Sequence, residues 1–364
     1  EVVTLRYENL KIKNFRGFKE LTISNLTRIN LFVGKNAVGK TALLEAVFVH
    51  NGFYNPSLAI SVNALRGLEP YKSDPLTSFE VPWSSLFNDY KMEDPIEIES
   101  DNEKGKSKTR LKALNLEEKI QLVEKLRRET FGMPVFSAES IQVLQFQFQR
   151  DIKQENREYF LILDQNDLRV LPVPQSPDFS TIIIPSSRRP VPQELSEKFS
   201  KLMISDKKLI KDIVDVSRIF EPRLREITIL TVGNIPILHA DIGIGRFVPI
   251  YYLSEGLVRA LYIGLSMFEV RNGVLLIDEI ENGIHYSVLR DFWKFLSKLS
   301  ELFNVQIFAT THSYECIAAA HEAFSKDSSD FKLYRLEKLD EEIVTKEFSN
   351  NDLETVFKAG FEIR

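Results

Sequence analysis

Residues 29–41 read INLFVGKNAVGKT and predict a buried strand that runs directly into a phosphate-binding loop. The residues from Ile29 to Val33 are apolar except for Asn30, as in a parallel strand covered on both faces. The next eight residues fit G-x-x-x-x-G-K-[ST], whose backbone N–H groups surround an anion at the positive end of the following helix. Apolar residues continue after the loop and predict a helix over residues 40–50. Strand, loop and helix together predict a nucleotide site.

Each position of this loop has an expected contact with the nucleotide. Two glycines remove side chains where the backbone must approach phosphate, and a lysine places a positive charge on the β and γ oxygens. The hydroxyl of Thr41 is an expected ligand of Mg²⁺. The residues predicted to bind the nucleotide here are Gly34, Lys35, Asn36, Ala37, Val38, Gly39, Lys40 and Thr41.

Length and composition indicate a soluble globular protein. The 364 residues are 43% hydrophobic and 27% charged, enough for two domains or for one large domain with an insertion. No apolar run approaches the roughly 20 residues of a membrane span, and the first residues do not resemble a signal peptide. We therefore expect a cytoplasmic protein with no membrane partner. A single cysteine, Cys316, excludes an internal disulfide, and a net charge of −5 does not indicate nucleic-acid binding, although a local basic groove stays compatible with it.

The pattern along the chain predicts an α/β fold with a mixed central sheet. Several strand-like stretches between residues 96 and 173 predict an antiparallel β subdomain beside that sheet. Residues 193–225 read as two amphipathic helices, too short and interrupted for a coiled coil, which we interpret as an inserted helical arm. The predicted division is 1–190 for a first lobe with the phosphate loop, 191–226 for the arm and 227–364 for a second lobe.

A tight turn at residues 13–18, KNFRGF, offers a further candidate contact with the nucleotide. An exposed aromatic ring and Arg16 on such a turn could lean over a purine base. The same turn is equally compatible with an ordinary hairpin whose phenylalanine lies in the core. Arg16 is kept as a candidate nucleotide contact.

The stretch VLLIDE at residues 274–279 predicts a buried strand that ends in two carboxylates. Asp278, at the carboxyl edge of the strand, can join the Mg²⁺ shell. Glu279 can accept a proton from the attacking water, and Glu281 is a lesser candidate for the same role.

Two more stretches are expected at the same edge of the sheet. Ser254, Glu255 and Gly256 begin a predicted helix, where a hydroxyl, free N–H groups and the positive end of the helix dipole form a second anion site. The strand at residues 305–309 delivers His312, which could bind the γ-phosphate or the attacking water. Open α/β sheets bind ligands beyond the carboxyl ends of their strands, so these residues should converge.

The order of these motifs resembles that of ATP-binding-cassette (ABC) ATPases. Phosphate loop, Leu-Ser-x-Gly helix start, strand with Asp-Glu and strand with Thr-His follow one another as they do in that family. The turn at residues 13–18 is further similar to the soluble branch that contains SMC, RecF and OLD-family proteins. This resemblance covers residues 1–50 and 240–325. Within that branch, the chain resembles stand-alone, Toprim-less OLD/RecF-like AAA family proteins. The sequence departs from the family pattern in two places. It has Glu255 and Leu257 where ABC transporters have Gly and Gln, and it lacks a glutamine at residues 186–188, the position of the Q-loop.

The resemblance implies hydrolysis of ATP by a homodimer. In such cassettes the helix start of one copy faces the phosphate loop of the other, so Ser254, Glu255 and Gly256 would complete the shell around Lys40 and Thr41 of a second copy. The implied cofactors are ATP and Mg²⁺. The implied catalytic residues are Glu279 and His312, with Thr41 and Asp278 as metal ligands.

Two functions stay open at this point. One is an ATPase that moves or clamps DNA in DNA repair or anti-phage defence; the other is a slow, nucleotide-controlled scaffold that regulates a separate toxin or nuclease effector. A transporter ATPase is disfavoured by the turn at residues 13–18 and by the 214 positions from Lys40 to Ser254.

Overall fold

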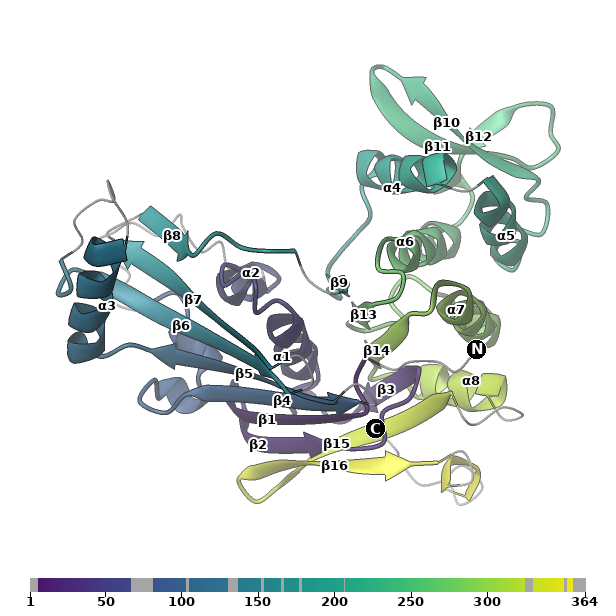
Figure 1. Cartoon of the computed structure of the whole chain (residues 1–364). Coiled ribbons are helices and arrows are strands. Elements are labelled where there is room, and N and C mark those ends of the chain that lie inside the picture. The colour runs from purple at the N-terminus through teal and green to yellow at the C-terminus, as the bar shows by residue number, and fades with distance from the viewer. Residues whose placement is uncertain are drawn as a thin grey trace.

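A six-stranded sheet carries the phosphate loop in the computed structural model, which describes residues 6–66, 81–102, 105–129, 137–151, 154–164, 167–176, 179–205, 207–324, 330–349 and 352–355. The strand order is β16-β15-β3-β14-β13-β9, and all strands except β16 run parallel (Figure 1). The bounds are β3 Ile29–Val33, β9 Thr181–Ile184, β13 Val274–Ile277, β14 Gln306–Thr310, β15 Phe331–Leu339 and β16 Glu342–Phe348. The predicted α/β class with a mixed central sheet is confirmed.

A seven-stranded antiparallel sheet forms the second layer, on the left of Figure 1. Its order is β2-β1-β4-β5-β6-β7-β8, so neighbours along the chain are mostly neighbours in the sheet. The bounds are β1 Asn9–Phe15, β2 Phe18–Ile23, β4 Ile96–Asn102, β5 Gly105–Ala113, β6 Ile141–Arg150, β7 Glu155–Asp164 and β8 Asp167–Leu171. The antiparallel β subdomain predicted beside the central sheet is confirmed.

Helices cover the six-stranded sheet on both faces. Side chains of one face, such as Phe32 and Phe308, pack with α1 and the antiparallel sheet, whereas Leu31 and Ile307 on the other face pack with α6, α7 and α8. The two faces are therefore two separate cores. The bounds of the helices are α1 Lys40–Asn51, α2 Leu58–Ala64, α3 Leu116–Glu129, α6 Glu255–Glu269, α7 Leu289–Phe303 and α8 Tyr314–Phe324, with 3₁₀ turns η1 Ser84–Leu86, η2 Asn88–Tyr90, η3 Ile250–Tyr252 and η4 Tyr286–Val288.

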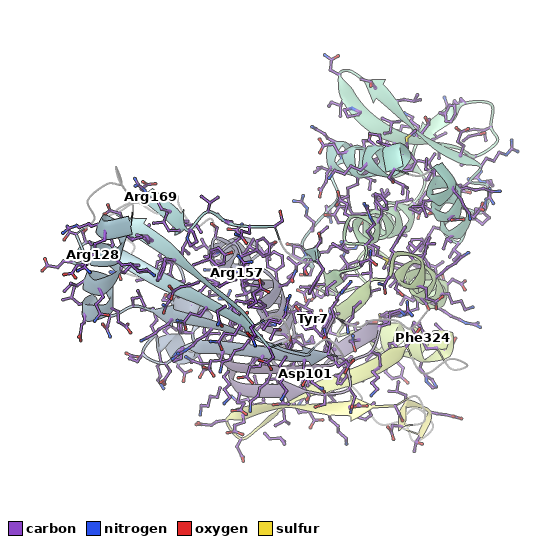
Figure 2. The ribbon with its side chains drawn as sticks, viewed as in Figure 1. Tyr7, Asp101, Arg128, Arg157, Arg169 and Phe324 are labelled. Carbon is purple, nitrogen blue, oxygen red and sulfur yellow. The ribbon has the colours of Figure 1, made fainter. Side chains whose placement is uncertain are left out.

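A buried glutamine fixes the chain start against the six-stranded sheet. The Oε1 of Gln306 accepts hydrogen bonds from the backbone N–H groups of Arg6 and Tyr7, and its Nε2 donates to the carbonyl of Tyr7 at 2.8 Å. The ring of Tyr7 meets Phe308 edge-on at 5.9 Å between centroids, where the two sheets adjoin in Figure 2. These contacts hold the antiparallel layer in place beside the strands that carry the site.

The two helices expected in the inserted arm at residues 191–226 are present. They are α4 Pro192–Ser205 and α5 Lys207–Ser217, and they lie over α6 together with a three-stranded sheet, in the upper right of Figure 1. Leu195, Phe199 and Ile213 are fully buried there. Because the apolar sides of the helices face α6 and this sheet, the inserted segment forms a packed subdomain. The strands of this sheet are β10 Glu226–Val232, β11 Ile235–Asp241 and β12 Phe247–Pro249.

The division of the chain into lobes does not follow the central sheet, which takes β3 and β9 from residues 1–190 and its other four strands from residues 227–364. Residues 352–355 form a helical turn near the end of the described residues. None of the helices in the described ranges has both the length and the apolar character that crossing a membrane would require.

A buried histidine gives the fold an acid-sensitive point. The ring nitrogens of His50 lie 2.7 Å from Thr109 Oγ1 and 3.0 Å from Ser100 Oγ, and burial lowers the pKa of His50 to about 3. The unfolded imidazole binds a proton below its usual pKa of about 6.5, whereas the folded one stays neutral. The free energy of unfolding should therefore fall by about 2 kcal/mol between pH 6.5 and pH 5 through this residue alone.

The variant His50→Gln keeps hydrogen-bonding groups but does not titrate. Urea unfolding at pH 7 and pH 5 should show a smaller acid loss for this variant than for the wild type. The exposed His285→Gln is the matched control and should behave as the wild type. Equal acid losses in His50→Gln and the wild type would contradict the assignment.

Candidate functional site: a phosphate loop facing a carboxylate cluster

The phosphate loop follows β3 and ends at the first residue of α1. Gly34 and Gly39 have φ angles of 144° and 100°, a region that favours glycine. A Cβ on Gly34 would lie 2.5 Å from the carbonyl oxygen of Leu336, and one on Gly39 would lie 2.8 Å from the ring of Phe18. Both glycines are therefore required by the fold as well as by the approach of a phosphate.

Lys40 spans the loop in this structure. Its Nζ donates to the carbonyl of Gly34 at 2.7 Å and to that of Lys35 at 3.2 Å. Burial lowers the pKa of Lys40, and the nearby carboxylates of Asp278, Glu279 and Glu281 oppose that shift. The ammonium thus lies between the loop and a cluster of negative charge.

Thr41 and Asp278 lie together, as expected of two ligands of one metal ion. The hydroxyl of Thr41 donates to Asp278, with oxygen separations of 3.0 and 3.2 Å. Thr310 Oγ1 donates to the same carboxylate at 2.6 Å and accepts from the backbone N–H of Glu279 at 2.9 Å. The fully buried Thr310 therefore joins β14 to the end of β13 and fixes both carboxylate residues.

Glu279 is held in an unusual backbone conformation. Its φ is 48°, which is uncommon for a residue with a side chain and typical of functional sites. Its Oε2 accepts from the amide of Asn282 at 2.9 Å, and its Oε1 lies 3.5 Å from Nδ1 of His312. The structure thus brings the two predicted catalytic residues together.

Glu281 lies on the other side of His312. Its Oε1 accepts from the backbone N–H of His312 at 3.3 Å and lies 3.6 Å from the Nδ1 of that ring. Among the described residues, its Oε2 is buried without a hydrogen-bond partner. Glu281 thus contacts both the backbone and the ring of His312.

Ser254, Glu255 and Gly256 form the start of α6, as predicted. The hydroxyl of Ser254 caps the helix by accepting from the N–H of Leu257 at 3.3 Å. This helix belongs to the core on the opposite face of the six-stranded sheet from α1. In the part of the chain that the structure describes, no hydrogen bond or ion pair joins residues 254–256 to the phosphate loop.

Arg16 does not face the phosphate loop. Its guanidinium donates to Glu45 at 3.0 Å, to Asn63 at 2.8 Å and to the carbonyl of Ser85 at 3.0 Å. Phe15 beside it is fully buried, so the aromatic ring expected to be exposed on this turn is a core residue. The hairpin interpretation of this turn is the one that the structure supports. Arg16 reaches the site only through Glu45, one turn after Thr41 on α1.

Two residues that complete the site, Thr310 and Asn282, were not among the predicted site residues. Asn282 follows Glu279 by three positions, which could have suggested a polar contact. Thr310 reaches Asp278 and Glu279 only through the pairing of β13 with β14, which the sequence does not state.

Removal of the Thr310 hydroxyl should damage both the fold and the site. Thr310→Val keeps the shape but removes the hydroxyl that accepts from the N–H of Glu279 and donates to Asp278, which costs about 1–3 kcal/mol. Thermal unfolding should register this loss, and turnover should fall with little change in the KM for ATP. The control Thr345→Val removes an exposed hydroxyl that bonds to Thr22. Wild-type turnover in Thr310→Val would contradict this role.

Comparison with known proteins agrees with this geometry. The sequence model of the AAA ATPase domain family matches residues 7–317. The "ATP/GTP phosphatase" of Helicobacter pylori is 24% identical over 383 aligned positions, which cover 96% of this chain and 98% of that protein. The DNA replication and repair protein RecF of Lactobacillus johnsonii is 50% identical, but over only 40 residues and 11% of each chain.

A solved structure with a similar fold is an SMC head bound to the C-terminal winged-helix domain of ScpA. The TM-score is 0.50 at 15% identity, over 97% of this chain and 99% of that one. The family match spans most of the chain and includes the phosphate loop, Asp278, Glu279 and His312. The chain therefore belongs to the AAA ATPase domain family.

Proposed function

We propose that two copies of the chain bind head to tail around ATP and hydrolyse it at sites that both copies complete. The observation that carries this proposal is the position of α6. Its first turn offers a second anion site on the face of the sheet opposite to α1, without contact to the phosphate loop of its own chain. A single copy thus contains two separated halves of a triphosphate site.

The oxygen atoms of Thr41 and Asp278 fit a Mg²⁺ ion. They lie 3.0 Å apart, and two adjacent ligands at the usual Mg²⁺ distance are about 2.9 Å apart. Two protein oxygens beside a phosphate cradle match the way Mg²⁺ is bound in nucleotide sites. When bound, the ion would neutralise charge on the phosphates.

The other residues take their roles from position. Loop N–H groups and Lys40 would bind the β and γ phosphates, with the loop residues Lys35, Asn36, Ala37 and Val38 shaping the turn. Glu279 would accept the proton of the attacking water, and His312 would orient that water or the γ-phosphate. Ser254, Glu255 and Gly256 of the second copy would cover the γ-phosphate, while Arg16 would support α1 through Glu45.

Mixing two inactive variants tests the shared site. Lys40→Ala keeps an intact α6 start, and Ser254→Ala keeps an intact phosphate loop, so a mixed dimer contains one complete site. Mixing equal amounts should restore roughly a quarter of wild-type hydrolysis, because half of the dimers are mixed and each has one site of two. No recovery, with both variants folded, would show that each chain hydrolyses ATP alone.

We further propose that the chain acts on DNA, which its SMC/RecF-like type supports. Double-stranded DNA should stimulate ATP hydrolysis, and the stimulation should weaken as salt rises, since phosphate contacts release counterions. If DNA does not change the rate of hydrolysis and the product of a neighbouring gene co-purifies stably, the alternative function is favoured, in which the chain regulates a separate effector.

A further inference from the structure

A cavity beside the start of α6 includes Glu255 and Asn282 in its lining but no residue of the phosphate loop. It measures about 700 Å³ and is bounded by the segment after β9, the first turns of α6 and the turn after β13. Arg188, Arg189 and Arg259 line it, with Glu255 and Asn282 also in its wall. Three guanidinium groups therefore share the wall with a single acidic residue.

Two of these arginines have no acidic partner within the described ranges of the chain. Arg188 pairs with Glu194 at 2.6 Å, but Arg189 is exposed without an ion pair. Arg259 is 5% exposed and makes one hydrogen bond, from Nη1 to the carbonyl of Arg188 at 3.2 Å. Its Nε and Nη2 are buried without any partner. Unpaired N–H groups of a buried cation are costly, and an anion would satisfy them.

The hydroxyl of Tyr251, on the same wall, is also buried and has no hydrogen-bond partner among the residues that the structure describes. Burial of the site lowers the pKa of Arg259 and raises that of Tyr251 to about 12, so the first stays a cation and the second a neutral donor at neutral pH. Both groups offer donors and neither offers a negative charge.

We propose that this cavity binds the phosphate group of a small molecule. Guanidinium groups match phosphate oxygens in geometry and charge. The volume lies in the range of small-molecule sites and exceeds what a bare phosphate fills. These features favour a mononucleotide or sugar phosphate over free phosphate.

Asn282 connects this cavity to the hydrolytic site. Its amide donates to Glu279 at 2.9 Å and to the carbonyl of Ser186 in the cavity wall at 3.3 Å. A ligand that shifts this wall would therefore change the orientation of the Glu279 carboxylate. This coupling rests on the proposed role of Glu279, whereas binding in the cavity does not.

Equilibrium dialysis on the full-length Lys40→Ala variant tests binding, because that variant has no functional phosphate loop. AMP should bind, and adenosine should bind about tenfold more weakly or less. In the Lys40→Ala background, adding either Arg189→Ala, which changes an exposed side chain, or Arg259→Gln should lower the affinity for AMP by about tenfold or more. Arg246→Ala, an exposed arginine outside the cavity, is the matched control.

Competition by inorganic phosphate against bound AMP distinguishes the two sources of the ligand. If phosphate displaces AMP at concentrations similar to those of unlabelled AMP, the site binds free phosphate. If much higher concentrations of phosphate are needed, the site binds a nucleotide. No AMP binding to Lys40→Ala, or an affinity unchanged by both arginine variants, would overturn the proposal. At saturating ATP, AMP should change wild-type turnover about twofold or more, and Asn282→Ala should still bind AMP but lose that response. If the wild type hydrolyses ATP but its turnover does not change with AMP, the coupling is overturned while the proposed function stays intact.

Discussion

Lys40→Ala should lower the affinity for ATP by at least about 10²-fold, because one charge-assisted contact to phosphate in a partly enclosed site contributes about 3 kcal/mol. In this structure the ammonium is held by two carbonyls of the loop and is only half-buried. Its removal should therefore affect nucleotide binding more than folding. Isothermal titration with ATP and Mg²⁺ measures the affinity directly.

Thermal unfolding supplies the control for this prediction. A ligand that binds only the folded state raises its stability, so saturating ATP should raise the Tm of the wild type and leave that of Lys40→Ala nearly unchanged. Lys298→Ala removes an exposed lysine of α7 and should keep the full ATP response. Unchanged ATP affinity in Lys40→Ala would refute the phosphate-loop assignment.

The parts of the site that could be predicted are those encoded in a short run of sequence. The stretch at residues 29–41 contains the strand, the glycines and the helix start, and the structure has β3 and α1 within one residue of the predicted bounds. The strand before Asp278 is likewise defined by four consecutive apolar residues. The order of the strands was not predicted, since no local pattern states which strands are neighbours.

The parts that could not be predicted depend on contacts between distant segments. The ion pair of Arg16 with Glu45 crosses 29 positions, and the hydrogen bond of Thr310 to Asp278 crosses 32. Helices α4 and α5 have amphipathic sequences that suit a projecting pair as well as a packed one. Only the presence of α6 and the β10–β12 sheet beside them decides between these arrangements.

The backbone conformation of Glu279 fits the role of general base that we propose for it. Its positive φ is stabilised by the hydroxyl of Thr310, and its carboxylate lies between Asn282 and His312. The strain is thus balanced by contacts from β14 and from the turn after β13. Such an arrangement aims one carboxylate at one position beyond the sheet edge, as a general base requires.

Glu279→Gln should therefore leave ATP binding intact while lowering turnover by about 10²-fold or more, because glutamine has the same shape but cannot accept the proton of the attacking water. With hydrolysis blocked, the ATP-bridged dimer should persist. Light scattering should give twice the 42.0 kDa mass of the chain when ATP and Mg²⁺ are present, and the mass of one chain without nucleotide.

Combining Glu279→Gln with Ser254→Arg, which places a bulky side chain at the start of α6, should abolish that dimer. The exposed Glu301→Gln should hydrolyse ATP at the wild-type rate. A Glu279→Gln protein that binds ATP but stays a single chain would contradict the shared site, and one that turns over normally would show that another residue is the base.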